Sequence, residues 1–302
     1  MTKFIEDSDW PRASSLLRSP RESDQRLVLI GVPLYLASLT PGRCDLAPGA
    51  IRTALRRFST YDLEHSVELE GMHIADVGDL PVAELNPEAA FATIVENIRA
   101  CTEKSKILLV LGGDNSVTRS MVHGVANSLT EIGLITLDAH LDIRRLELGL
   151  TNGNPIRALL DDGMPGQNIV QIGLQPFANS ATYARYAKEN GIRGISMSEV
   201  SQKGIAVVIK EALETLSHTR RIVVDFDLDV LDRAYMPGAH GARPGGLSPR
   251  ELFEAAYLLG KSSAVVGADF VELDPTCDIA DISVMSAVKC LLSFVAGIAE
   301  RR

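Results

Sequence analysis

The feature that most constrains the fold is a series of short apolar runs, each of which ends in polar or glycine-containing residues. Six runs are rich in Val, Ile and Leu: residues 27–32, 107–111, 133–137, 169–172, 222–226 and 265–271. Runs of this length are too short for buried helices and are typical of strands that are buried on both faces of a sheet.

Longer segments with helical periodicity lie between these runs. The clearest of them cover residues 48–58, 180–189, 205–216, 248–259 and 282–299. Pro48 suits the first turn of a helix, and Ser248 and Glu251 have the spacing of a capping box. The alternation of strand and helix predicts an α/β fold, in which helices cover both faces of a parallel sheet.

No repeat, low-complexity tract or linker divides the 302 residues. We therefore expect a polar N-terminal lead-in at residues 1–25 and a single α/β domain at residues 26–302. The four cysteines are far apart and lack the spacing of a disulfide framework or a zinc site, which predicts reduced thiols in a cytoplasmic protein.

The composition disfavours several classes of partner. Residues 1–21 mix acids and bases, so we expect no signal peptide, and no uncharged run is long enough to predict a membrane span. The net charge is −9, and lysine and arginine form no cluster, which argues against nucleic acids and anionic membranes. A small-molecule substrate is favoured by elimination.

Polar clusters follow four of the apolar runs. They occupy residues 112–116, 138–144 and 227–232, together with Glu272 and Asp274. In open parallel sheets, ligands bind beyond the carboxyl ends of the strands. The sequence therefore predicts that acids from four strand ends meet at one edge of the sheet.

Two of these clusters have the residue types of a metal site. In Asp138-Ala139-His140-Leu141-Asp142, alternate residues share a face, and carboxylates and imidazole are ligands for divalent manganese, iron or zinc. The segment Asp225-Phe226-Asp227-Leu228-Asp229 repeats the alternation with acids alone. Each string by itself also fits a solvated turn or strand exit. Together, Asp138, Asp142, Asp227 and Asp229 carry four negative charges, which two divalent cations would balance.

In this order, these motifs resemble those of the arginase, agmatinase and formimidoylglutamase superfamily. The resemblance rests on Gly112-Gly113-Asp114-Asn115-Ser116, Asp138-Ala139-His140-Leu141-Asp142 and Asp227-Leu228-Asp229. It extends to residues 42–52, to Pro244-Gly245-Gly246-Leu247-Ser248 and to Val271-Glu272-Leu273-Asp274-Pro275, and so covers nearly the whole chain from Leu27 onward.

The resemblance implies an arginase-like three-layer αβα sandwich with two Mn(II) ions and a hydroxide between them as the nucleophile. It matches Asp138 and Asp227 to bridging ligands, His140 and Asp229 to ligands of one ion, and Asp142 to a ligand of the other. Glu272 matches the acid that holds the cationic NH₂ groups of the substrate. Family members are commonly homo-oligomers, which we expect here also.

Two departures from the family pattern bear on the subfamily. Asn115 stands where most members have a metal-binding histidine, so it is either a weak ligand of a loosely held ion or no ligand. Asn152 stands where arginases and agmatinases carry a histidine that is thought to shuttle protons, which an amide cannot do. We expect Asp142 to relay the proton to the leaving amine instead.

These departures resemble one branch of formimidoylglutamases, enzymes of histidine breakdown that hydrolyse N-formimidoyl-L-glutamate to L-glutamate and formamide. The matching residues are Asn115, Arg144, Asn152, Arg157, Thr276 and Asp278. The substrate has two carboxylates and a cationic head, so a site needs arginines outside and acids within. The expected substrate-binding residues are Arg144, Asn152, Asn154, Arg157 and Glu272, with Arg145 and Arg243 as weaker candidates.

Two alternatives stay open at this level. A guanidine hydrolase of the agmatinase or guanidinobutyrase type would release urea, and a metal-poor, non-catalytic family member would act in binding or regulation. His240, in a glycine-rich loop after the second acidic segment, is a candidate for the border of the site and for proton transfer.

Overall fold

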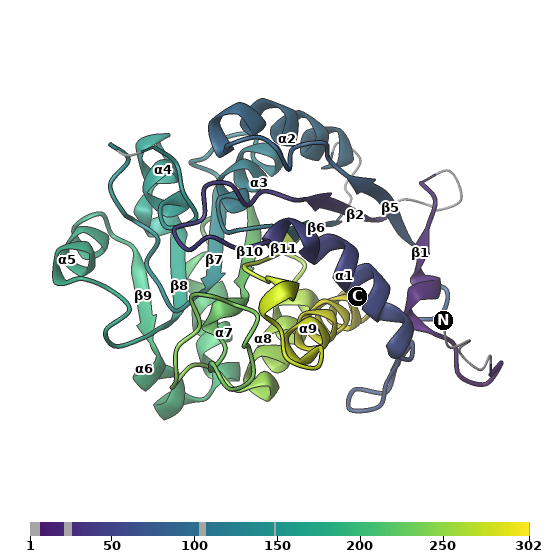
Figure 1. The fold of residues 1–302 in the computed structure, drawn as a ribbon. Helices are drawn as coiled ribbons and strands as arrows, with labels where there is room; N and C mark the ends of the chain where they lie inside the picture. Colours follow the sequence, from purple (N-terminus) through teal and green to yellow (C-terminus); the bar gives the residue numbers. More distant parts are fainter. Residues whose placement is uncertain (1–6, 21–25, 103–106, 148, 302) are drawn as a thin grey trace.

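The computed structural model describes residues 7–20, 26–102, 107–147 and 149–301. A sheet of parallel strands runs through the molecule, with helices on both faces (Figure 1). From one edge to the other, the strands are β1 (Leu17–Arg18), β5 (Ile74–Asp79), β2 (Leu27–Val32), β6 (Ile107–Gly112), β11 (Val265–Val271), β10 (Arg221–Asp227), β7 (Ile132–Leu137), β8 (Ile169–Leu174) and β9 (Arg193–Ser196). The predicted three-layer αβα architecture is confirmed.

The two faces of the sheet carry separate apolar cores, because alternate side chains of a strand point to opposite faces. In β6, Leu109 and Leu111 belong to one core, and Leu108 and Val110 to the other. The first core packs against α1 (Ala47–Ala54), α6 (Met197–Lys203), α7 (Ile205–Thr215), α8 (Pro249–Lys261) and α9 (Ile282–Ala299). The second packs against α2 (Pro87–Thr102), α3 (Val117–Val125), α4 (Pro155–Asp161) and α5 (Ala181–Glu189).

The six predicted strands all form, and residues 27–32 and 265–271 match β2 and β11 in both bounds. The predicted helices correspond to α1 with its 3-10 extension (Leu55–Arg57), α5, α7, α8 and α9. The capping box at the start of α8 is present, since Ser248 Oγ accepts the Glu251 N–H and Glu251 accepts the Ser248 N–H.

Three strands of the sheet lack the apolar run on which the predictions depended. β5 is buried only at Ile74 and Ala75 and alternates half-buried and exposed residues over residues 76–79. β1 and β9 are short strands at the two sheet edges. β1 follows a 3-10 helix (Ala13–Leu16), and both lie within the expected lead-in. A small antiparallel pair, β3 (Tyr61–Asp62) and β4 (Val67–Glu68), stands apart from the sheet.

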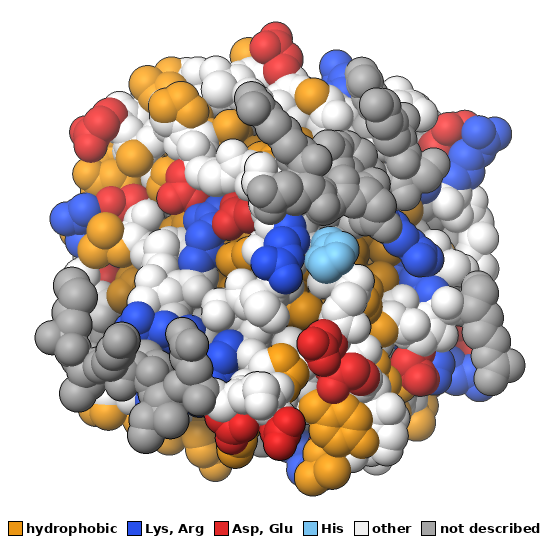
Figure 2. Space-filling view, turned by 90° about the vertical axis from the view of Figure 1, so that its right-hand side faces the viewer, with side chains coloured by type: hydrophobic (Ala, Val, Ile, Leu, Met, Phe, Trp, Pro, Cys, Tyr) orange, Lys and Arg blue, Asp and Glu red, His pale blue; other side chains and the backbone are white. Residues whose placement is uncertain are grey.

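By length and composition, α9 is a helix that could cross a membrane, but 72% of it is buried inside the protein, where it packs against α8 and α1. That degree of burial is typical of the core helix of a globular protein. On the face turned to the viewer in Figure 2, acidic and basic side chains are interspersed, and among the described residues neither sign forms a continuous patch.

Candidate metal centre

Four strands that are neighbours in the sheet end at the candidate site. In sheet order they are β6, β11, β10 and β7, and all of them run parallel. Asn115, Glu272, Asp227 and Asp138 follow or end these strands. β10 and β11 come last along the chain, yet they lie between β6 and β7. The sheet order therefore brings together acids that are up to about 130 residues apart in the sequence.

The acids form two clusters that share one residue. In each cluster, one ligand atom per residue lies within 4.8 Å of the others: Asp138, His140 and Asp229 form the first, and Asp138, Asp142 and Asp227 the second. Asp138 Oδ1 accepts the His140 N–H at 2.6 Å, whereas the buried Oδ2 has no hydrogen-bond partner among the described residues. An oxygen placed in this way is available to a cation.

The electrostatics of the clusters also fit cations. Burial and the nearby Asp229 raise the pKa of Asp138 to about 6, and burial with neighbouring carboxylates raises the pKa of Asp142 and of Asp227 well above its ordinary value. Burial alone would lower the pKa of His140, but Asp229, at 3.0 Å, and Asp138 raise it to about 12. Carboxylates crowded in this manner must hold protons or bind cations. The donor set suits two divalent ions.

The segment that carries three of these residues is held by an asparagine that sequence reasoning missed. Asn179 Oδ1 accepts the Leu141 N–H at 2.8 Å, and its Nδ2 donates to the Ala139 carbonyl at 3.1 Å. These bonds fix the backbone that leads into Asp142, which adopts a left-handed conformation with φ of 48°. Asn179 lies beyond the end of β8, so the rule that polar residues at strand ends line the site would have found it.

A close backbone approach shields the first cluster. A Cβ atom at Gly241 would lie 1.9 Å from Asp229 Oδ2, so only glycine allows this loop to cover that carboxylate. His240 precedes it and reaches the pocket described below.

Asn115, expected to be either a weak ligand or no ligand, forms two side-chain hydrogen bonds in the structure. Its Nδ2 donates to Asp142 Oδ2 at 2.7 Å, and its Oδ1 accepts from Thr118 Oγ1 at 2.7 Å. The carbonyl oxygen is therefore turned toward Thr118, and the amide nitrogen, which cannot bind a cation, faces the acids. In this orientation Asn115 holds the Asp142 carboxylate, and Thr118 in turn holds Asn115. The Thr118 hydroxyl is also 3.0 Å from Asp269 Oδ2.

Thr118→Val should weaken binding of Mn²⁺ by up to about tenfold. Thr118 positions Asn115, which in turn holds Asp142 Oδ2, and loss of a partner that orients a coordinating group costs roughly 10- to 100-fold in affinity. Titration of the metal-free protein, with free Mn²⁺ followed by electron paramagnetic resonance, measures the change. Thr136→Val is the matched control, since the buried Thr136 hydroxyl has no hydrogen-bond partner among the described residues. Equal affinities in both variants would contradict a role for Thr118 in orienting Asn115.

Glu272 lies on the other side of Asn115. Its Oε1 accepts the Asn115 N–H at 2.7 Å and Asn152 Nδ2 at 2.9 Å, and its backbone is left-handed with φ of 64°. Burial and the charge of Asp114 raise the pKa of Glu272 to about 8. Asn152 Oδ1 also accepts the Leu39 N–H, so this asparagine ties a surface loop to Glu272.

A pocket of about 330 Å³ opens onto these acids. Asp227, Asp229 and Glu272 line its buried part, whereas Arg144 and Arg243 line it with exposed side chains. Arg243 Nη1 donates to the Gly241 carbonyl at 2.8 Å, and Arg144 forms no ion pair within the described part of the chain. The pocket therefore combines an anionic floor with a cationic rim.

A model of the arginase family matches residues 25–297, which is most of the chain. The chain belongs to the arginase family. A formimidoylglutamase of Halalkalibacterium halodurans is 35% identical over 274 residues, which cover 89% of this chain and 86% of that protein. The crystal structure of formimidoylglutamase from Bacillus subtilis is 33% identical and superposes with a TM-score of 0.94, covering 99% of this chain and 95% of that one. A Trypanosoma cruzi formiminoglutamase crystallised with Mn²⁺ is 28% identical, with a TM-score of 0.88 over 97% of this chain and 100% of that one.

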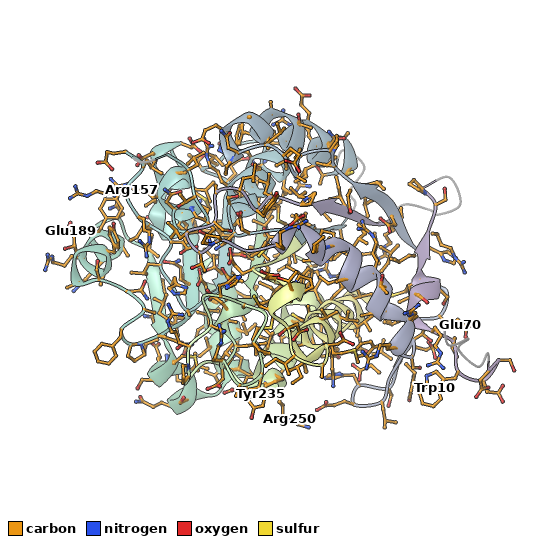
Figure 3. All side chains as sticks on the ribbon, in the orientation of Figure 1. Trp10, Glu70, Arg157, Glu189, Tyr235 and Arg250 are labelled. Atoms are coloured by element: carbon orange, nitrogen blue, oxygen red, sulfur yellow. The ribbon has the colours of Figure 1, made fainter. Side chains whose placement is uncertain are left out.

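Two residues expected at the substrate site lie elsewhere in this arginase-family chain. The Arg157 guanidinium lies 3.9 Å from the centre of the Tyr186 ring, and its Nε is 3.4 Å from Asp161. Arg157 lies near the outer side of the molecule (Figure 3), and it is not among the residues that line the pocket. Asn154 is buried, and its amide bonds to the backbone of its own loop at Thr151 and Gly149. Both side chains are thus engaged in holding α4 and the loop before it.

Proposed function

We propose that this chain is a hydrolase that converts N-formimidoyl-L-glutamate and water into L-glutamate and formamide, a reaction of histidine degradation. The observation that carries the proposal is the pocket, in which buried acids lie beneath two exposed arginines. This distribution of charge complements a substrate with a cationic formimidoyl head and two carboxylates. The names of the similar proteins support the same substrate.

In the proposed complex, the formimidoyl group lies at the acids and the glutamate carboxylates at the rim. Glu272 would accept hydrogen bonds from the NH₂ group of the head, and Asn115 and Asn152 hold the Glu272 carboxylate ready for this contact. Arg144 is the first candidate for a carboxylate, because its guanidinium has no competing ion pair within the described residues. Arg243 is the second.

Asp138, His140 and Asp229 would hold one divalent cation, and Asp138, Asp142 and Asp227 a second. The family resemblance favours Mn(II) and a bridging role for Asp227 as well as for Asp138. When bound, such ions supply Lewis acidity and lower the pKa of water.

Hydrolysis adds water to the formimidoyl carbon and breaks its bond to the glutamate nitrogen, so this nitrogen must take up a proton. Asp142 is the proposed relay, because it lies in the pocket and Asn115 fixes its Oδ2. His240 also lines the pocket and is the alternative donor. Asn152 takes no part in proton transfer, since an amide does not titrate near neutral pH.

The test is turnover of the Mn²⁺-loaded protein with formimidoylglutamate, agmatine, guanidinobutyrate and arginine, each supplied separately. We expect release of formamide and glutamate from formimidoylglutamate, and far lower rates with agmatine, guanidinobutyrate and arginine. Release of urea from a guanidine would instead identify a guanidine hydrolase. No turnover of any substrate, together with no retained metal, would identify a non-catalytic family member.

Arg144→Gln should raise KM for formimidoylglutamate by about 10- to 100-fold with a smaller effect on kcat, because a hydrogen bond to a charged group contributes roughly 1.5–3 kcal/mol. Arg157→Gln is the control, since this guanidinium is stacked on Tyr186 outside the pocket. Steady-state kinetics of both variants decide the point. An unchanged KM for the Arg144 variant would remove it from the substrate site, and a KM raised only by the Arg157 variant would reverse the assignment.

Three further expectations are also proposals. The absence of disulfides among the four cysteines supports a cytoplasmic location. The family resemblance supports a homo-oligomer. The match of the family model at residues 25–297 supports treating residues 26–302 as one functional unit.

A further inference from the structure

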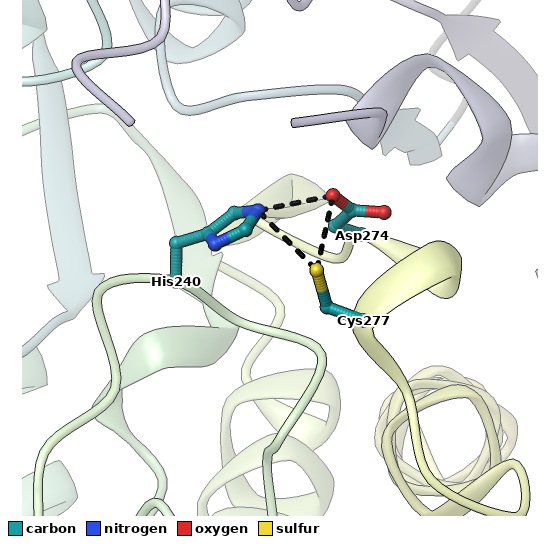
Figure 4. Close-up of side chains that lie close together, drawn as sticks. All are labelled: His240, Asp274 and Cys277. Atoms are coloured by element: carbon teal, nitrogen blue, oxygen red, sulfur yellow. Dashed lines mark hydrogen bonds and ion pairs between the residues drawn. The ribbon is translucent and has the colours of Figure 1, made fainter. Parts of the chain in front are cut away.

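A third group of potential ligands lies at the rim of the pocket, apart from the two acid clusters. It consists of His240, Asp274 and Cys277 (Figure 4). His240 Nε2 is 3.0 Å from Asp274 Oδ2, and Cys277 Sγ is 3.9 Å from His240 Nε2 and 3.7 Å from Asp274 Oδ2. The three atoms belong to two loops that are far apart in the sequence.

These separations are close to those between the ligands of a tetrahedral zinc ion. Bonds of about 2.0–2.1 Å to nitrogen and oxygen and about 2.3 Å to sulfur place N and O about 3.4 Å apart, and S about 3.6 Å from either. Each separation in the structure is within about 0.4 Å of its tetrahedral counterpart. The largest difference is between His240 Nε2 and Asp274 Oδ2, and small rotations of the His240 and Cys277 side chains would complete the arrangement.

The surroundings hold this group in place. Asp274 is buried; its Oδ1 accepts from the Thr276 N–H and hydroxyl, and its Oδ2 accepts the Arg43 N–H at 2.9 Å. Burial alone would raise the pKa of Asp274, but these bonds and His240 hold it at about 2, so the carboxylate is charged. A Cβ at Gly42 would lie 2.6 Å from His240 Nε2 and 2.8 Å from Asp274 Oδ2, so the missing side chain leaves space beside both atoms.

We propose that His240, Asp274 and Cys277 form a third metal site, which takes a zinc-like divalent cation with affinity for sulfur and is distinct from the acidic centre. Thiolate and imidazole ligands favour zinc, whereas manganese prefers carboxylate and other oxygen ligands. Binding releases the thiol proton to solvent, and the ion then takes the place of the hydrogens that now link the three side chains. Water would complete the tetrahedron on the exposed side.

The location gives this site a consequence for the pocket. His240 lines the pocket, and the next residue, Gly241, covers Asp229. An ion that joins His240 to Asp274 and Cys277 would fix this covering loop to the segment after Glu272.

The experiment uses the Mn²⁺-loaded protein with Co²⁺ as a spectroscopic probe of the third site. Cobalt bound to Cys277 should give an ultraviolet thiolate-to-cobalt charge-transfer band that saturates at one equivalent per chain, whereas cobalt at the acidic centre has no sulfur ligand and gives none. Excess Zn²⁺ should abolish the band. In Cys277→Ser the band should be absent, while basal turnover stays unchanged.

Two variants complete the design. Cys101→Ser, which alters a thiol outside the group, should keep the band. His240→Ala should weaken zinc binding by more than about 100-fold, because only two ligands remain. The absence of a thiolate band in the parent protein, or a band that survives Cys277→Ser, would overturn the proposal. Neither the thiolate band nor the zinc affinity depends on turnover of formimidoylglutamate, so a failure of the third site is separable from a failure of the proposed activity.

Discussion

Asp138→Asn is expected to abolish retention of both divalent cations and to lower kcat/KM by more than about 100-fold. Asp138 is the residue that the two acid clusters share, and its buried Oδ2 has no other partner among the described residues. Loss of a residue that only supports a ligand already costs roughly 10- to 100-fold, so loss of a shared ligand should cost more. Elemental analysis after Mn²⁺ loading and gel filtration, together with steady-state kinetics, measures both effects.

Asp225→Asn is the matched control for this substitution. Asp225 is also a buried aspartate, two residues before Asp227 in β10, but it belongs to neither cluster. Burial and the neighbouring Asp269 raise its pKa well above the ordinary value, so the neutral amide resembles the carboxyl that it replaces. The control should keep its manganese. Full retention of both ions by the Asp138 variant, or equal loss from both variants, would refute the assignment of Asp138 as the shared ligand.

The central strands could be predicted from the sequence because burial on both faces leaves a mainly apolar run, which is continuous in β2. The strands at or next to the sheet edges could not. β5 has polar residues such as Asp76 and Asp79 within it, and β9 has only four residues. The order of the sheet was equally inaccessible from local patterns, because the insertion of β10 and β11 between β6 and β7 depends on tertiary packing.

Much of the candidate site was predictable for a related reason: the acids stand at the ends of recognisable strands. The orientation of the side chains was not. Which end of the Asn115 amide faces the acids depends on Thr118 and Asp269, and the latter is 154 residues away in the chain. Arg157 and Arg144 look equivalent in the sequence, yet Tyr186 engages only the first. Charge and spacing predict which groups approach a site, whereas competing neighbours decide where each one points.

Removal of the divalent cations should destabilise the protein, and the loss should grow as pH rises from 5 to 8. In the metal-free protein, protons must neutralise the crowded carboxylates. The pKa of Asp138 is raised from 3.8 to about 6 and that of Glu272 from 4.5 to about 8. A carboxyl with a raised pKa contributes stability below its ordinary pKa and loses it as pH rises through the raised one. The raised pKa of His140 acts in the same direction above about pH 6.5.

Bound cations replace those protons, so the stability of the Mn²⁺-loaded protein should not fall in this way as pH rises. Above pH 5, about one pKa unit of the Asp138 shift and about three of the Glu272 shift remain to be lost. One unit corresponds to roughly 1.4 kcal/mol, so the loss should be at least roughly 3 kcal/mol, which in a protein of this size changes Tm by several degrees. The gap in Tm between Mn²⁺-loaded and chelator-treated protein should therefore widen by at least about 5 °C between pH 5 and pH 8, as followed by circular dichroism. In the metal-free state, Asp138→Asn, which has no carboxyl to ionise at this position, should lose less Tm between pH 5 and pH 8 than the metal-free parent protein. A gap that stays constant or narrows with pH would mean that neutralisation of the buried acids is not what the cations contribute to the fold.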